Sequence, residues 1–192
     1  MSYFLDVIGS FAIGGIIVLL IIRFNESMIS ASNESLIYNL AQFNTTELSQ
    51  ILEYDFYKIG FRVDDENKFG IAEKSKVEFY SDYDNNGTID TVRYFLSDTS
   101  ALSSTPNQND KLLYRKLNDD NPESIGRVVL FELGYLDSAG TEITPISDLS
   151  DAAARTKIKG IDVHIYVESE FPIADEYQGA EWRKKLILKN IY

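Results

Sequence analysis

The sequence predicts an α+β fold in which one long N-terminal helix packs on an antiparallel β-sheet. In the first 60 residues, apolar side chains recur at helical spacings, and the first proline of the chain is Pro106. Beyond Gly60, short runs rich in β-branched and aromatic residues alternate between apolar and polar positions, which is the period of a half-buried strand. With 192 residues the chain is long enough to bury a substantial core behind such a helix.

The first part of the predicted helix is a hydrophobic stalk, residues 1–24. Its uncharged run covers the 16 residues between Asp6 and Arg23. Sixteen helical residues span about 24 Å, which approaches the thickness of a bilayer core of about 30 Å. A single-span anchor and a stalk that assembles with copies of itself both fit this run. A cleaved secretory signal fits less well, because residues 1–6 contain no Lys or Arg.

The second part of the helix, residues 25–59, has apolar residues on one side and Asn, Ser, Glu and Gln on the others. This amphipathic pattern is typical of a helix that packs one face on a core. Gly60 is the expected stop, because glycine readily adopts the left-handed conformation that ends helices. We expect the head, residues 25–192, to be built around an apolar helix face led by Leu40, Leu48, Ile51 and Leu52.

The rest of the head is predicted to be sheet. Alternation is clearest at Ile161, Val163, Ile165 and Val167, and it indicates an antiparallel sheet with one buried face. Residues 148–155 fit either a short helix or an extended loop. The expected strands are 76–81, 88–96, 111–117, 126–136, 159–169 and 182–189.

Composition limits the functions that this chain can have. The formal charge is −12, and the two charges of the stalk cancel, so the whole excess belongs to the head. So acidic a head should be soluble and should avoid nucleic acid, which needs basic surfaces. There is no cysteine, which excludes disulfides, thiolate zinc sites and cysteine nucleophiles. The single histidine, His164, lies on a predicted strand where a structural role is favoured over general-base chemistry. With no catalytic motif, we expect no enzymatic activity.

The turn between the first two long strands carries a calcium-loop pattern. Oxygen-bearing side chains at alternate positions can converge on one hard cation, and glycine at the sixth position permits the sharp turn that this needs. Position 12 is Arg93 instead of a bidentate Glu, which excludes an EF-hand. An ordinary Asn-Gly-type hairpin turn without metal is the alternative. The candidate ligands of Ca²⁺ are Asp82, Asp84, Asn86 and Asp90 at positions 1, 3, 5 and 9, with the Thr88 carbonyl at position 7 and Gly87 at position 6.

Several segments, in order along the chain, resemble those of type IV pilin-like proteins. The similarity is closest to the J-type minor pseudopilins of type II secretion and the W-type minor pilins. Residues 2–6 resemble the mature pilin start, 52–61 the end of the long helix with Asp55 and Gly60 in register, and 79–94 the first hairpin. The segments 113–115, 129–140 and 186–190 resemble later strands of the family.

The resemblance implies a structural filament subunit that polymerises through its N-terminal helix with identical or homologous pilin subunits. Such a protein lies in the inner membrane as a precursor and then in a periplasmic pseudopilus or an extracellular filament. The rival interpretations are a single-span, non-polymerising calcium-binding or adhesin-like surface protein, and a secreted adhesin.

The resemblance also assigns a role to Asp6. In the family an acidic residue at the fifth place pairs with the N-terminal amine of a neighbouring subunit, and an unpaired charge in a dry filament core is costly. Removal of Met1 would leave Asp6 fifth and let Ser2 supply the amine. Two features differ from the family: Met1 stands where a basic leader ending in Gly is usual, and the acidic residue is Asp instead of Glu. In the alternative, Asp6 lies at the lipid headgroups of a simple anchor.

Overall fold

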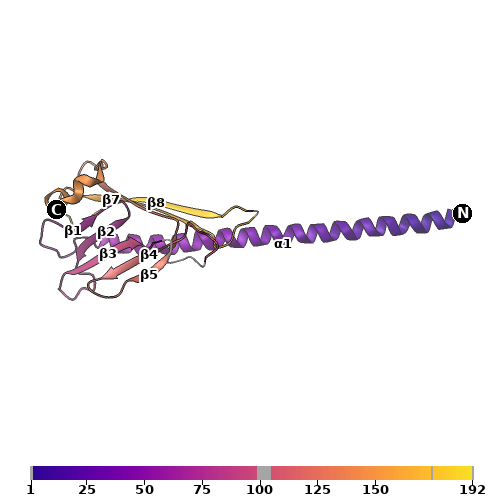
Figure 1. Ribbon diagram of the computed structural model, residues 1–192, viewed down its shortest axis with the longest axis horizontal. Coiled ribbons are helices and arrows are strands. Elements are labelled where there is room, and N and C mark those ends of the chain that lie inside the picture. Colours follow the sequence, from indigo (N-terminus) through magenta and orange to yellow (C-terminus); the bar gives the residue numbers. More distant parts are fainter. Residues whose placement is uncertain (1, 99–104, 174, 192) are drawn as a thin grey trace. The chain divides into compact units, whose positions relative to one another are not determined.

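The computed structural model describes residues 2–98, 105–173 and 175–191. It confirms the α+β prediction, because one long helix, α1 (Ser2–Tyr57), precedes two antiparallel sheets (Figure 1). By its contacts the chain divides into two compact units, Met1–Asn39 and Leu40–Tyr192. The sequence-based boundary at residue 24 lies just after the uncharged run, which ends at Ile22. We refer to Leu40–Tyr192 as the folded unit.

The first unit consists of helix, and nearly all of its described side chains are exposed. Gly14 and Gly15 do not interrupt it, although glycine disfavours a helix interior by about 1 kcal/mol per residue. By length and composition, α1 is able to cross a membrane, and none of its most apolar stretch is buried. An N-terminal membrane span is therefore compatible with the structure.

The folded unit contains two sheets in which every strand pairs antiparallel with its neighbour in the chain. The larger sheet is formed by β1 (Phe69–Ala72), β2 (Lys76–Ser81), β3 (Asp90–Leu96), β4 (Lys111–Leu117) and β5 (Glu123–Val128). The smaller sheet is formed by β6 (Leu130–Leu136), β7 (Gly160–Glu168) and β8 (Gly179–Ile187), with η2 (Ile146–Ser150) and α2 (Ala152–Arg155) between β6 and β7.

The expected strands 76–81 and 111–117 are confirmed with their bounds, but the single strand expected at 126–136 is wrong. That run divides at Val129 into β5, which pairs with β4, and β6, which pairs with β7. The backbone N–H of Val129 already bonds to Tyr166 of the smaller sheet, 2.8 Å from its carbonyl oxygen. No turn residue marks the break, so the sequence alone shows one apolar run.

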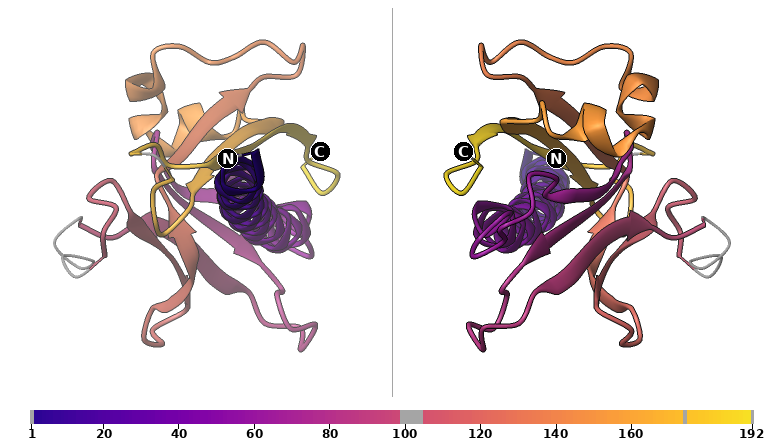
Figure 2. Two further views of the ribbon diagram at one scale, coloured as in Figure 1. Left: turned by 90° about the vertical axis from the view of Figure 1, so that its right-hand side faces the viewer. Right: turned by 90° about the vertical axis from the view of Figure 1, so that its left-hand side faces the viewer.

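The last part of α1 packs against both sheets (Figure 2). The ring of Phe56 meets Phe79 of β2 and Tyr94 of β3 edge-on, at centroid distances of 5.9 and 5.4 Å. Leu48 lies against Gly126 of β5, where an added Cβ would come within 2.7 Å of the leucine side chain. On the other side, Lys184 of β8 forms an ion pair with Glu53 at 2.5 Å. This half of the helix is therefore part of the core.

The buried helix face differs in part from the expected one. Leu48 and Leu52 are buried and Ile51 is half-buried, but Leu40 is 53% exposed. The residue buried at this level is Ala41, which precedes Leu48 by seven positions and so shares its face. Leu40 lies about 100° around the helix from Ala41, because successive residues rotate by that angle. The sequence pattern placed Leu40 on the buried face of the helix, whereas in the structure more than half of this residue is exposed.

Gly60 ends the helical region as expected. It has a φ of +75°, and an added Cβ would lie 2.9 Å from the backbone oxygen of Asn190. Both the conformation and the close approach favour glycine at this position. The Asn190 side chain donates a hydrogen bond to the carbonyl of Tyr57, at 3.0 Å, and so satisfies a free carbonyl at the helix end. The chain then passes beside the loop between β2 and β3.

Candidate functional sites

The β2–β3 loop, residues 82–89, has the backbone conformation of a sharp polar turn. Ser81 and Asp90 are paired across the two strands, so the intervening residues form the connection. Asn85 and Gly87 have φ values of +64° and +88°. Asn and Gly are the residues that most readily adopt this left-handed conformation, so the local sequence accounts for the turn.

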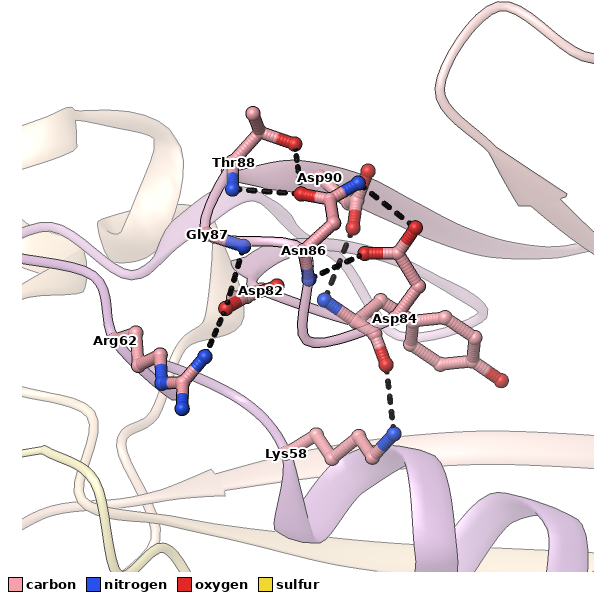
Figure 3. A network of polar contacts seen from close by, with 9 residues as sticks. Lys58, Arg62, Asp82, Asp84, Asn86, Gly87, Thr88 and Asp90 are labelled. Carbon is pink, nitrogen blue, oxygen red and sulfur yellow. Dashed lines mark hydrogen bonds and ion pairs between the residues drawn. The ribbon is translucent and has the colours of Figure 1, made fainter.

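Three carboxylates converge in this loop. Asp82, Asp84 and Asp90 each place one carboxylate oxygen within 4.8 Å of the others (Figure 3). Asp82 and Asp90 are buried, whereas Asp84 is exposed. The structure thus brings together all three carboxylates that the sequence selected.

The two oxygens of the Asp82 carboxylate differ. Its Oδ2 accepts hydrogen bonds from Arg62 at 2.8 Å and from the backbone N–H of Gly87 at 3.2 Å. The other oxygen, Oδ1, is buried and has no hydrogen-bond partner among the described residues. The bond from Arg62 holds the pKa of Asp82 below its ordinary value, so the carboxylate is ionised at neutral pH.

The other two carboxylates accept bonds from their surroundings. Asp90 accepts hydrogen bonds from Asn118 Nδ2 at 2.7 Å and from the backbone N–H of Tyr83 at 3.0 Å. Asp84 accepts hydrogen bonds from the backbone N–H of Asn86 at 3.0 Å and from the Asn86 side-chain amide at 2.8 Å. A carboxylate has about four acceptor positions, so these bonds leave each group able to bind a cation as well.

Asn86 and Thr88, the remaining predicted ligands, are engaged with each other. The Asn86 side-chain oxygen accepts bonds from the Thr88 backbone N–H, at 2.7 Å, and from its hydroxyl. Thr88 therefore contacts Asn86 through its backbone N–H and its hydroxyl, and not through the carbonyl that the sequence pattern selected as a ligand. These bonds hold the loop in its turn and direct the Asn86 oxygen toward Thr88.

Residues that follow the end of α1 hold the loop in place, and the sequence pattern did not predict these contacts. Lys58 Nζ donates to the Tyr83 carbonyl at 2.7 Å, and its ammonium lies 4.6 Å from the centre of the Tyr83 ring (Figure 3). The backbone N–H of Asp82 donates to the Phe61 carbonyl at 3.0 Å. Together with the Arg62–Asp82 ion pair, these contacts connect the loop to the segment that follows the helix.

A buried carboxylate, Asp55, lies next to this connection. Its oxygens accept hydrogen bonds from the hydroxyls of Tyr83, at 2.9 Å, and Tyr94, and from Arg115 at 3.3 Å. Burial, followed by the negative charge of Asp55, raises the pKa of both tyrosines above the ordinary value. The phenols therefore stay neutral and act as donors. The sequence spacing could have indicated that Asp55 is buried, because it follows Leu52 by three positions and so lies on the same side of the helix.

The candidate assembly residues lie at the start of α1. Asp6 is exposed, and its carboxylate has no hydrogen-bond or ion-pair partner within the part of the chain that the structure describes. Its backbone carbonyl accepts the Ser10 hydroxyl at 2.8 Å. Met1 and the side chain of Ser2 lie outside the described residues. The pairing of Asp6 with the Ser2 amine of another copy stays a prediction.

His164 lies close to an acidic side chain on the adjacent strand. Its Nε2 lies 2.7 Å from the Glu181 carboxylate on the adjacent strand β8. This cross-strand pair joins β7 to β8 in the smaller sheet. The expectation that the chain is not an enzyme stays a prediction.

Comparisons with known proteins add no assignment. No family model, no curated protein and no solved structure matches the chain. The pilin-like resemblance is therefore carried by the sequence motifs alone.

Proposed function

We propose that this chain is a structural subunit of a type IV pilus-like filament or a type II secretion pseudopilus, and that it polymerises through its N-terminal helix. The observation that supports this most is the extent of exposed apolar side chains along α1. They continue well beyond the uncharged run that a membrane would cover. A simple anchor needs about 20 apolar residues and gives no reason for more.

The additional apolar residues form a strip. Ile29, Leu36, Leu40 and Phe43 are 63%, 59%, 53% and 65% exposed. They follow one another at spacings of seven, four and three, which places them on one side of a helix. Covering a large apolar side chain gains about 1.5–3 kcal/mol, so such a strip favours a packing partner. The partner we propose is the N-terminal helix of neighbouring copies.

The charge pattern of the stalk is consistent with the same partner. Asp6 stands immediately before the uncharged run, and a carboxylate in a membrane-spanning segment is costly without a partner. The N-terminal amine of a neighbouring copy would supply that partner and would fix the axial position of one helix against the next. Before assembly the stalk would reside in the membrane, with the inner membrane as the precursor's location and the periplasm or cell exterior as the filament's.

Replacing Asp6 tests filament assembly separately from anchoring in the membrane. In cells that make the filament, Asp6→Ala should leave the amount of protein in the membrane fraction unchanged, because it removes a charge from an apolar helix. Incorporation into sheared or pelleted filaments should fall by at least about tenfold, since the loss of a paired buried charge costs several kcal/mol.

The matched control is Glu26→Ala, which removes an exposed carboxylate from the same helix outside the uncharged run. It should assemble like the wild type. If Asp6→Ala enters filaments as efficiently as Glu26→Ala, Asp6 does not pair across copies. If the wild type itself never enters a filament, the chain is a non-polymerising membrane-anchored surface protein.

A further inference from the structure

The geometry points to the β2–β3 loop as a binding site for one Ca²⁺ ion. This inference is independent of the proposed filament function, since the loop lies in the folded unit. The observation that carries it is Asp82 Oδ1, a buried carboxylate oxygen with no hydrogen-bond partner among the described residues. Buried polar atoms are almost always satisfied, and an unsatisfied charged one is particularly costly.

The ordinary polar turn explains every other contact of the loop. Its backbone N–H groups bond to Asp82 Oδ2, to Asp84 and to the side chain of Asn86. None of these bonds uses Asp82 Oδ1. A cation between the three carboxylates would satisfy this oxygen, whereas the turn alone leaves it without a partner.

The charge balance leaves room for one divalent ion. Asp82, Asp84 and Asp90 contribute three negative charges, and the Arg62 guanidinium, bonded to Asp82, contributes one positive charge. The nearby Lys58 ammonium bonds to the Tyr83 carbonyl instead of a carboxylate. The remaining charge of the cluster is therefore −2, which one Ca²⁺ neutralises.

The spacing of the oxygens suits calcium. Ca²⁺ binds oxygen at 2.3–2.6 Å, so two ligands on opposite sides of it are about 4.6–5.2 Å apart. The corresponding span for Mg²⁺ is about 4.0–4.2 Å, since its bonds are 2.0–2.1 Å long. The three carboxylate oxygens lie within 4.8 Å of one another. One calcium ion can therefore contact all three oxygens, and its larger and more flexible oxygen shell favours it over magnesium.

The ligands would be Asp82 Oδ1 and one oxygen each from Asp84 and Asp90. Asp84 is exposed, which gives the ion an entry path and leaves space for water. Asn86 Oδ1 would join once the Thr88 hydroxyl releases it, and the Thr88 carbonyl would complete the protein ligands. Ca²⁺ accepts such mixed shells of six to eight oxygens, whereas Mg²⁺ requires a compact octahedron.

The binding test uses the full chain purified in detergent. Thermal unfolding is followed in chelator, in millimolar calcium and in millimolar magnesium. Calcium should raise the melting temperature by roughly 5–10 °C when present at about 100 times its dissociation constant. Magnesium should raise it less. Equilibrium dialysis with radioactive calcium should give one bound ion per chain.

Two variants locate the ion. Asp84→Ala should unfold like the wild type in chelator, because Asp84 is exposed, and should lose the rise caused by calcium. Asp119→Ala, which removes another exposed aspartate, should keep that rise. The proposal is overturned if calcium neither binds nor raises the wild-type melting temperature, if magnesium has an equal effect, or if Asp84→Ala retains the full rise.

Discussion

At the scale of residues, the buried carboxylate of Asp55 connects the end of the helix to the larger sheet. It is fully buried and joins α1 to three residues of the larger sheet and its β2–β3 loop, namely Tyr83, Tyr94 and Arg115. A buried charge of this kind is tolerated only when its oxygens are fully bonded. Removing it would leave the two phenols and one side of the guanidinium without their acceptor.

We predict that Asp55→Ala lowers the free energy of unfolding by about 3–5 kcal/mol, because it breaks a buried ionic network. The control is Glu123→Ala, which removes the other, mostly exposed carboxylate bonded to Arg115. That change should cost about 0–1 kcal/mol, as exposed ion pairs do. Denaturant unfolding of the two variants measures the difference. Equal, small losses would show that Asp55 is not a structural centre.

The candidate metal centre was predictable in part. Alternate acidic residues around a glycine identified the loop, and the structure brings Asp82, Asp84 and Asp90 together. The roles of Lys58 and Arg62 were not predictable, because they depend on where the end of the helix meets a loop more than 15 residues further along. Local spacing carries no information about such contacts.

At the scale of elements, α1 was the most predictable part of the fold. The absence of proline, the helical spacing of apolar residues and Gly60 together predicted a helix of about the observed length. Its buried face was less predictable, because the apolar residues Leu40 and Phe43 are exposed. Apolar character alone therefore does not separate the core side of the helix from its solvent side. The sequence pattern placed Leu40 on the core side, but the structure buries Ala41 and Thr45 instead.

We predict that Leu52→Ala destabilises the folded unit by about 2–5 kcal/mol, because it leaves a cavity in a fully buried site. The neighbouring Ile51→Ala is the control. Ile51 is half-buried, so its truncation should cost clearly less. Thermal or denaturant unfolding ranks the two. A larger loss at Ile51 would mean that the helix packs with a different face.

The sheets show where alternation succeeds and fails as a signal. Strands flanked by polar turns, such as β2 and β4, were found with their bounds. β1 was missed because it has only four residues, one of them Gly70, whose missing side chain accommodates Glu78. The break at Val129 was missed because apolar residues continue across the change from one sheet to the other.

At the scale of the whole molecule, the chain combines two segments of opposite character. Its apolar N-terminal helix has the composition of a membrane span, and all of its net charge of −12 lies after residue 24. The acidic part favours solubility, and the apolar part requires lipid or neighbouring helices. A subunit that leaves the membrane to enter a filament would satisfy both requirements.

Cross-linking along α1 tests this claim most directly, because the chain has no native cysteine. Leu36→Cys places a thiol on the exposed apolar strip, and Glu34→Cys places one on the other side of the helix. With a short bis-maleimide reagent in intact cells, Leu36→Cys should form cross-linked dimers and larger species, and Glu34→Cys far fewer. Adding Asp6→Ala to Leu36→Cys should abolish these products. Equal cross-linking at both positions, or cross-linking that persists without Asp6, would contradict assembly through the N-terminal helix.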